Sequence, residues 1–276
     1  MLKSGLITKV NSDTFTVKYD NLFIDCKSRG KFRNEKIKPF VGDKVLVDIE
    51  KKVIEEVSER KNYLLRPPVS NVDIALIVTS VVEPNLNLSL LDKLISIVTI
   101  NNIEPVIVFT KLDKSNKKEI KNLKILIKYY EKIGIKVFNN IKIRKLKKYL
   151  KNKIVTVCGQ TGAGKSTLIN KFNKDLNLAT NEISKSLGRG KHTTRIVELF
   201  EIENFYIVDT PGFSSIDINF YSAEEIKNSF KEFKGCECKF KDCNHINELG
   251  CKVIENKNNG MILDSRYENY LKFIKE

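Results

Sequence analysis

The residues with the most specific chemistry form a glycine-rich run within residues 154–170, between an apolar segment and the start of an amphipathic one. Gly159, Gly164, Lys165 and Ser166 fill the pattern G-x-x-x-x-G-K-[ST] in this strand-then-helix context. Backbone N–H groups of such a loop turn toward a phosphate, and the positive end of the following helix favours the same anion. We predict that Lys165 reaches the β- and γ-phosphates of a nucleotide and that the Ser166 hydroxyl binds Mg²⁺. An ordinary glycine-rich turn is the alternative, and the flanking strand and helix argue against it. The predicted nucleotide contacts are Gly159, Gln160, Thr161, Gly162, Ala163, Gly164, Lys165, Ser166 and Thr167.

A second short motif predicts which base the nucleotide carries. The apolar run Pro105–Phe109 leads into Thr110, Lys111, Leu112 and Asp113, which resemble the [NT]-K-x-D motif of GTPases. A carboxylate at Asp113 would accept from N1–H and the N2 amino group of guanine, whereas adenine offers it no matching donors. Taken alone, the tetrapeptide could also be a strand followed by a helix-capping aspartate. Beside a phosphate loop it favours a GTPase over an ATPase of similar layout, and Asp113 discriminates between the two.

Two segments after the phosphate loop are expected to sense the γ-phosphate. Residues 187–195, LGRGKHTTR, carry the two glycines and paired threonines of a segment that closes over Mg²⁺. Residues 209–212, DTPG, follow a predicted strand and place a carboxylate near Mg²⁺ and a glycine N–H near the γ-phosphate.

The order of these motifs predicts a rearranged domain. The base-reading motif precedes the phosphate loop here, whereas in an ordinary small GTPase it follows, so we expect a circular permutation. Such a change is tolerated when the old termini lie close together on the surface. Its consequence is mechanical, because the chain leaves residues 209–212 and runs directly into the C-terminal module.

The segments before the phosphate loop read first as short strands and then as alternating strands and helices. An N-terminal barrel resembling an OB-fold is expected, and from Val72 onward a buried parallel sheet, with Ser89 as the N-cap of its first helix. The predicted barrel strands are Leu6–Val10, Thr14–Tyr19, Leu22–Cys26, Lys44–Ile49 and Lys52–Val57. Between them lies either an RNA-contacting loop or an exposed basic loop with two core phenylalanines. Its residues are Lys27, Arg29, Lys31, Phe32, Arg33, Lys36, Lys38 and Phe40.

A cluster of soft ligands lies near the C-terminus, after a helix that Ser222 and Glu225 cap. Its spacing, C-x₄-C-x-H-x₅-C, suits one tetrahedral Zn²⁺, and four protein ligands imply a structural site. Cys236 is an extra thiol that we rank as a non-ligand. A reduced cluster without metal is the alternative. The predicted ligands are Cys238, Cys243, His245 and Cys251.

Composition bounds the compartment and the partner. The chain of 276 residues has a formal net charge of +15 and a pI near 9.4, which indicate a polyanionic partner, although part of the lysine excess reflects compositional bias. No apolar run approaches the ~18 residues of a membrane span, and the N-terminus lacks the features of a signal peptide. A cytoplasmic protein is expected, without a disulfide framework.

The whole chain resembles the bacterial ribosome-small-subunit-dependent GTPase family RsgA, also called YjeQ. The resemblance rests on the barrel, Arg66-Pro67, the permuted motif order, GRGKHTT, DTPGF and the Cys-Cys-His-Cys module. It implies binding to the small (30S) subunit and its 16S rRNA late in maturation, with GTP hydrolysis stimulated by the subunit and used for release. Residues 138–140 depart from the guanine-contacting S-A-[KLT] segment usual in GTPases, which weakens any assignment there.

The resemblance also implies roles for individual residues. Thr194, or else Thr193, would be the switch ligand for Mg²⁺, and Asp209 would support the metal through water. Because Phe213 stands where many GTPases place a water-orienting Gln, His192 is the candidate that positions the attacking water. A switch histidine that contacts only solvent or rRNA is the alternative. The catalytic set is His192, Lys165 and Thr194, the Mg²⁺ ligands are Ser166 and Thr194, and Asp209 and Gly212 complete the nucleotide site.

We therefore predict an α/β protein with three parts. These are an OB-like RNA-binding barrel over residues 1–66, a circularly permuted P-loop GTPase domain over 67–217 and a helical zinc-binding module over 218–276. The expected activity is hydrolysis of GTP to GDP and phosphate by a monomer that holds one Zn²⁺ and uses Mg²⁺. The competing class is a nucleotide-gated RNA-binding module in which hydrolysis is incidental.

Overall fold

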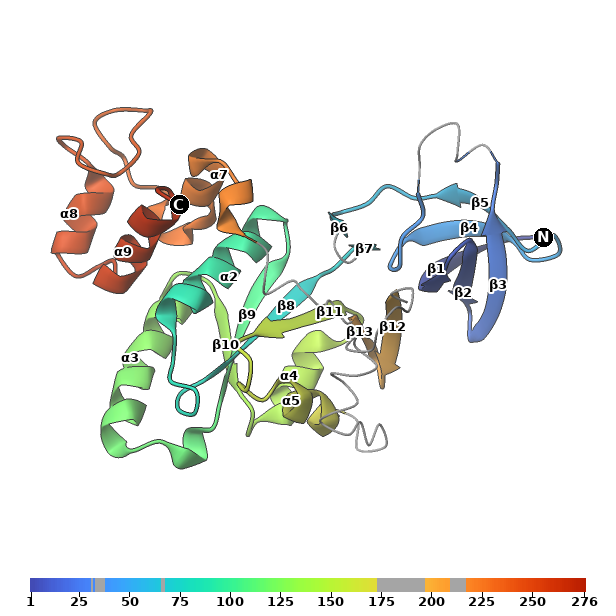
Figure 1. The fold of residues 1–276 in the computed structure, drawn as a ribbon, viewed down its shortest axis with the longest axis horizontal. Helices are drawn as coiled ribbons and strands as arrows, with labels where there is room; N and C mark the ends of the chain where they lie inside the picture. Colours follow the sequence, from blue (N-terminus) through green and yellow to red (C-terminus); the bar gives the residue numbers. More distant parts are fainter. Residues whose placement is uncertain (31, 33–37, 66–67, 173–196, 209–216) are drawn as a thin grey trace. The chain divides into compact units, whose positions relative to one another are not determined.

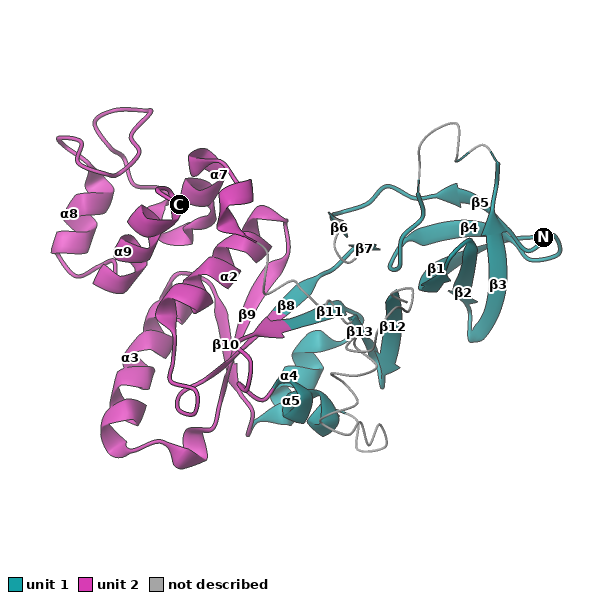
Figure 2. Ribbon diagram, viewed as in Figure 1, with its two compact units in different colours: residues 1–75, 142–157, 165–213 teal, residues 76–141, 158–164, 214–276 magenta. Residues whose placement is uncertain are grey.

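The computed structural model describes residues 1–276 except 31, 33–37, 66–67, 173–196 and 209–216 (Figure 1). Two compact units are present (Figure 2). Unit 1 comprises residues 1–75, 142–157 and 165–213, and unit 2 comprises residues 76–141, 158–164 and 214–276. Among the described residues, no helix is both long and apolar enough to cross a membrane.

The N-terminal strands of unit 1 close into a barrel, as predicted. Each successive strand pairs with the next in the order β1-β2-β3-β5-β4, and β4 returns to pair with β1, for example at Gly5↔Val45. Alternating residues point inward, so that Ile7, Val17 and Val47 are fully buried in one apolar core. The strands are β1 (Leu2–Asn11), β2 (Thr14–Tyr19), β3 (Leu22–Ser28), β4 (Lys44–Asp48) and β5 (Val53–Val57).

Both phenylalanines of the basic loop between β3 and β4 are buried. Phe32 is 3% exposed and packs in the barrel core, and Phe40 is 7% exposed. Neither ring is therefore available to stack on a base, because both faces are covered by protein. Of the basic residues in this loop, Lys31, Arg33 and Lys36 lie outside the described residues.

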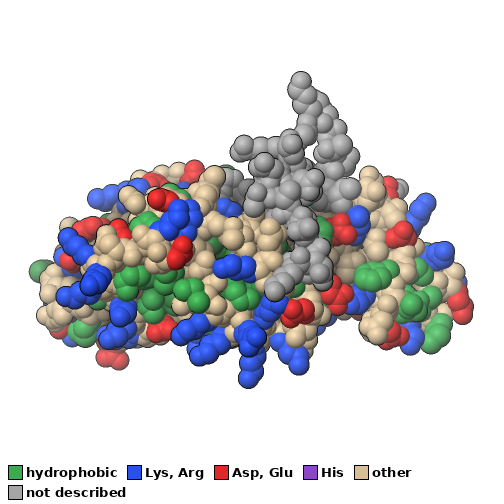
Figure 3. Space-filling view, turned by 90° about the horizontal axis from the view of Figure 1, so that it is seen from below, with side chains coloured by type: hydrophobic (Ala, Val, Ile, Leu, Met, Phe, Trp, Pro, Cys, Tyr) green, Lys and Arg blue, Asp and Glu red, His purple; other side chains and the backbone are tan. Residues whose placement is uncertain are grey.

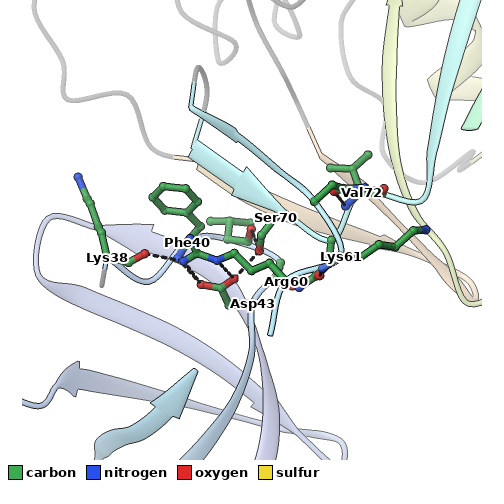
Figure 4. A network of polar contacts seen from close by, with 11 residues as sticks. Lys38, Phe40, Asp43, Arg60, Lys61, Ser70 and Val72 are labelled. Carbon is green, nitrogen blue, oxygen red and sulfur yellow. Dashed lines mark hydrogen bonds and ion pairs between the residues drawn. The ribbon is translucent and has the colours of Figure 1, made fainter. Parts of the chain in front are cut away.

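A buried carboxylate ties the barrel to the hairpin that follows it (Figure 4). Asp43 accepts from Arg60 Nε and Nη2, each at 2.8 Å, from the Ser70 hydroxyl at 2.6 Å and from the Phe40 N–H at 2.7 Å. The Arg60 guanidinium lies 4.3 Å from the centre of the Phe40 ring, within cation–π range. Asp43 is fully buried and its charge is balanced by hydrogen bonds, as a buried carboxylate requires. The hairpin strands are β6 (Tyr63–Leu65) and β7 (Pro68–Ser70).

The remaining elements of unit 1 form an α/β layer. β13 (Phe205–Val208) pairs parallel with β11 (Ile154–Gly159) and antiparallel with β12 (Val197–Ile202). The β12 strand also pairs with β1 at Lys9↔Glu198. Two helices accompany these strands, α4 (Ile143–Leu150) and α5 (Lys165–Phe172).

Unit 2 is built on three strands in the order β10-β9-β8, followed by a helical module. The strand β8 (Ile74–Ser80), which enters this unit at Leu76, is buried along its whole length, as expected for a strand covered on both faces. β9 (Glu104–Thr110) and β10 (Lys136–Asn139) run parallel. The helices are α2 (Leu88–Ile100), α3 (Lys117–Lys132), α7 (Ala223–Ser229), α8 (Lys252–Asn258) and α9 (Asp264–Phe273), with short 3₁₀ turns at Leu112–Lys114, Ile218–Phe220 and Lys231–Phe233.

One predicted helix cap is correct and another is wrong. Ser222 and Glu225 form the expected reciprocal capping box at the start of α7. Ser89, in contrast, lies inside α2, because the Asn87 side chain accepts from the Leu90 N–H at 2.9 Å and caps the helix earlier. The start of α2 was misplaced because two residues capable of capping occur close together.

Candidate functional site

The phosphate loop joins the end of β11 at Gly159 to the first residue of α5, Lys165. Gly159, Gly162 and Gly164 all have positive φ, at 131°, 80° and 92°. A Cβ at Gly159 would lie 2.0 Å from the carbonyl oxygen of Val78, so this position accepts no side chain. The glycines thus occur where the backbone must turn tightly, which leaves N–H groups of the loop to face an anion. Lys165, Ser166 and Thr167 open the helix that follows, as predicted.

The base-reading motif lies directly against the phosphate loop within unit 2. Thr110 ends β9 and is 2% exposed. Its hydroxyl donates to the carbonyl oxygen of Ala163 at 2.6 Å, across 53 positions of sequence. This bond fixes the distance between the part of the site that would hold phosphates and the part that would read the base. Threonine at the first position of the motif therefore has a structural role in addition to its match to the pattern.

The two charged residues of the motif follow Thr110 on an abrupt turn. Lys111 has a φ of 57°, a left-handed conformation unusual for a residue with a side chain. It leads into a short 3₁₀ turn over Leu112–Lys114 that carries Asp113, whose side chain is exposed. Asn140, in the segment that departs from the usual guanine-contacting sequence, donates its backbone N–H to the carbonyl oxygen of Phe109. That contact brings residue 140 next to the strand that delivers the motif.

The residues expected to sense the γ-phosphate lie outside the described residues. They are His192, Thr193, Thr194, Asp209, Gly212 and Phe213. The described residues break off at Val208 of β13, immediately before the D-x-x-G segment, and resume at Asp217.

The four predicted metal ligands come together in the C-terminal part of unit 2. The ligand atoms of Cys238, Cys243, His245 and Cys251 all lie within 4.8 Å of one another. His245 Nδ1 lies 3.6 Å from Cys238 Sγ and 3.4 Å from Cys251 Sγ, and the two sulfurs are 3.9 Å apart. Zn–S bonds of about 2.3 Å in a tetrahedron give sulfur–sulfur separations of roughly 3.8 Å. The cluster therefore has the size and donor set of a single-metal site.

Burial disfavours the thiolate form of these cysteines unless a cation lies among them. It raises the pKa of the Cys243 thiol to about 12 and raises that of Cys251, while it lowers the pKa of the His245 imidazole. Thiolates at neutral pH would need a positive charge among them, which a metal ion supplies. Cys236 is not one of the four clustered ligands. Its sulfur accepts from Asn256 Nδ2 at 3.4 Å and contacts the Glu232 carbonyl oxygen at 3.6 Å.

The loop that carries the ligands is held by side chains behind it. The Tyr267 hydroxyl donates to the His245 carbonyl oxygen at 2.7 Å, and the Tyr270 hydroxyl donates to that of Asn244 at 2.5 Å. The Glu248 carboxylate accepts three backbone N–H groups of the loop, which lowers its pKa. These bonds orient the backbone of His245, whose φ is 58°. The helix α9 thus supports the cluster from outside the ligand set.

A fully buried arginine joins this module to the helix α2. Arg266 on α9 donates to Asp92 Oδ1 of α2 at 2.8 Å and to the two carboxylate oxygens of Glu232 at 2.6 and 3.0 Å. Arg266 and Asp92 are both 0% exposed. The two carboxylates hold the pKa of Arg266 well above its ordinary value despite its burial. No spacing rule signals this network, because its members are far apart in sequence and each is one of many charged residues.

A phosphate loop pinned through a threonine hydroxyl to a T-K-x-D motif defines a P-loop GTPase domain, and the motifs stand in permuted order. Family models agree with this class, since the RsgA GTPase model matches residues 57–219 and the RsgA N-terminal domain model matches residues 4–53. The chain belongs to the RsgA GTPase family.

Similar proteins share the full length of the chain. The small ribosomal subunit biogenesis GTPase RsgA 2 of Oceanobacillus iheyensis is 43% identical over 287 residues, covering 100% of this chain and 97% of that protein. The RsgA of Staphylococcus haemolyticus is 42% identical over 283 residues, with the same coverage. The crystal structure of YjeQ from Thermotoga maritima matches with a TM-score of 0.87 at 35% identity, covering 100% of this chain and 98% of the other. That of YloQ, described as a circularly permuted GTPase, matches with a TM-score of 0.84 at 30% identity and covers 100% and 94%. The predicted fold class and GTPase activity are thereby confirmed.

Proposed function

We propose that this chain hydrolyses GTP during late maturation of the small (30S) ribosomal subunit. In this proposal it binds the subunit through 16S rRNA as a cytoplasmic monomer, and the subunit stimulates hydrolysis, which releases the factor. The observation that carries the proposal is full-length similarity to proteins named for small-subunit biogenesis. The geometry of the described nucleotide motifs supports it, because Thr110 holds the base-reading segment against the phosphate loop.

Within that reaction the residues divide into binding and catalytic groups. Lys165 would neutralise the β- and γ-phosphates while Ser166 and Thr194 bind Mg²⁺, the metal on which phosphoryl transfer depends. Asp209 would hold the metal through water, and Gly212 would donate to the γ-phosphate. His192 would orient the attacking water, a contribution of positioning and not of covalent chemistry.

The supporting parts have assigned roles as well. One structural Zn²⁺ held by the cysteine–histidine cluster would order the C-terminal module, so that its loop presents a fixed surface. We divide the chain functionally into a barrel that contacts RNA, residues 1–66, a GTPase domain, 67–217, and the metal-binding module, 218–276.

Steady-state turnover with and without purified small subunits tests the proposal. An assembly GTPase should turn over slowly alone and roughly a hundredfold faster or more with subunits, which is what positioning of a catalytic group contributes. Turnover that does not change on addition of subunits, at concentrations where binding is measured directly, favours an RNA-binding module with incidental hydrolysis.

The guanine preference tests the role of Asp113. GTP and GDP should bind far more tightly than ATP, because Asp113 accepts from two donors that adenine lacks. Asp113→Asn should move the preference toward xanthine nucleotides, whose 2-oxo group accepts from the new amide. Equilibrium titrations with guanosine, xanthosine and adenosine diphosphates measure this, and an unchanged guanine preference in the variant refutes the assignment.

A further inference from the structure

A short turn between β8 and α2 touches both nucleotide motifs of unit 2. We call it the brace turn, residues 81–86. The backbone N–H of Val81 donates to the carbonyl oxygen of Thr110 at 3.2 Å. The hydroxyl of Ser80, the residue before the turn, donates to the carbonyl oxygen of Pro84 at 2.6 Å. A Cβ built on Gly162 would lie 3.5 Å from Pro84 Cδ, in ordinary contact. The brace turn therefore lies against the base-reading motif and also against the phosphate loop.

Glu83 is the residue of the brace turn that meets the charges of the motif. Its φ of 51° turns the backbone so that its carbonyl oxygen accepts from Lys111 Nζ. Its carboxylate pairs with Lys114 Nζ at 2.5 Å. This pairing lowers the pKa of Glu83 and raises that of Lys114. One residue thus binds Lys111 of the motif and Lys114, the residue that directly follows Asp113.

The charge of Lys114 matters because it lies beside the carboxylate that reads the base. Lys114 directly follows Asp113 in the 3₁₀ turn Leu112–Lys114, and the Asp113 charge contributes to the raised pKa of Lys114. Within the described part of the chain, the Asp113 carboxylate has neither a hydrogen bond nor an ion pair, whereas Lys114 is held by Glu83. A lysine released from Glu83 would find Asp113 as its next carboxylate and would compete with the donors of guanine.

We propose that Glu83 is a positioning residue for guanine recognition, which holds Lys111 through its carbonyl and Lys114 through its carboxylate and so leaves Asp113 free for the base. The proposal rests on the base-reading role of Asp113 given above. Glu83 and Lys114 have exposed fractions of 67% and 53%, so their ion pair contributes little to the stability of the fold. Its effect is expected in ligand discrimination.

Glu83→Gln tests this directly, because glutamine keeps the backbone carbonyl and the side-chain shape while it removes the charge. Affinity for GDP should fall about three- to fivefold as Lys114 moves to Asp113, the size expected when an exposed ion pair competes for one carboxylate. Affinity for ADP, which does not use Asp113, should stay within about twofold of the wild-type value. The thermal unfolding midpoint should not change.

The double variant Glu83→Gln/Lys114→Met separates positioning from a general loss of structure. Without Lys114 no competitor remains, so GDP affinity should return to within about twofold of wild type. The matched control is Glu203→Gln, since Glu203 also has a positive φ, 53°, and pairs with a lysine, Lys147, but lies in the turn between β12 and β13. This control should bind GDP normally.

Three results would overturn the proposal: wild-type GDP affinity in Glu83→Gln, an equal loss of ADP affinity, or a double variant no better than the single one. Asp113→Asn measured alongside keeps this failure distinct from failure of the proposed function. If Asp113→Asn shifts its preference to xanthine nucleotides while Glu83→Gln binds GDP as the wild type does, only the proposed role of Glu83 is refuted. If Asp113→Asn keeps its guanine preference, the base-reading assignment is lost as well.

Discussion

His192 is the residue on which the proposed catalysis depends, because Phe213 carries no group that could orient water. His192→Ala should bind GTP and the small subunit normally but lose most of the subunit-stimulated kcat. Lys165→Ala is the comparison, since it should lose nucleotide affinity as well. Single-turnover hydrolysis on saturating subunits measures both. Full stimulated kcat in His192→Ala would assign water positioning to rRNA or backbone and would leave the GTPase activity intact.

Individual residues were predictable from sequence where the chemistry is local. Gly159 to Ser166 lie in the phosphate loop and the start of α5, and Cys238 to Cys251 lie within one short segment, so their spacing alone indicates that they can meet around a ligand. The brace turn could not be predicted from the sequence because Glu83 acts through a backbone carbonyl and an exposed carboxylate. A glutamate before a proline gives no pattern that distinguishes such a contact from an ordinary turn.

Among the elements, the hairpin β6–β7 is held to the barrel by the buried carboxylate of Asp43, which lies outside the hairpin. Asp43→Asn should lower the free energy of unfolding by about 2–3 kcal/mol, because Arg60 would lose its carboxylate partner in a buried site. The exposed barrel residue Asp25, which accepts from the Thr16 hydroxyl at 2.7 Å, provides the control. Asp25→Asn should cost less than about 1 kcal/mol. Urea denaturation compares the two, and equal losses would show that the network adds nothing beyond an ordinary surface bond.

The metal-binding loop depends on its ligands and not on thiols in general. Purified protein should contain about one Zn²⁺ per chain. Cys243→Ser should lose the metal, loosen the C-terminal module and weaken subunit binding, while GDP affinity stays nearly intact. Cys236→Ser is the matched control, because Cys236 bonds to Asn256 and Glu232 and should be dispensable for the metal. Elemental analysis measures the zinc content of each protein. Absence of zinc from wild-type protein purified without chelators, or an equal loss of zinc in both variants, would contradict the proposed site.

Elements were predicted well where one stretch of chain determines them. The alternation of Thr14–Tyr19 placed β2 correctly, and the apolar run of β8 was recognised as a buried strand. The start of α2 was misplaced because Asn87 and Ser89 can both cap a helix. The attachment of the barrel to its hairpin could not be anticipated, since Asp43, Arg60 and Ser70 meet only in the folded chain.

At the scale of the whole molecule, the formal charge of +15 should act on the binding of the subunit. In Figure 3, Lys and Arg side chains occur across the face shown and are interspersed with Asp and Glu. Subunit affinity should fall by about tenfold or more between 50 and 200 mM salt, since phosphate contacts release counterions. Binding measured over that range gives the slope, with GDP affinity over the same range as the control. Equal salt dependences of subunit affinity and GDP affinity would contradict a specific electrostatic contribution of the net charge to subunit binding.

The ion pair between Asp92 and Arg266 has a consequence for folding during synthesis on the ribosome. The two residues stand 174 positions apart, so a ribosome adding about 5–20 residues per second makes them roughly 10–35 s apart. During that interval Asp92 of α2 has the Tyr130 hydroxyl as a hydrogen-bond donor but not yet the cation that balances its charge, and an unbalanced charge resists burial. We therefore expect the face of α2 that carries Asp92 to stay hydrated until α9 has emerged. Nascent chains stalled before Arg266 should be cut by protease within α2, whereas chains stalled after α9 has left the exit tunnel should resist; equal cleavage of both would show that α2 closes without its arginine.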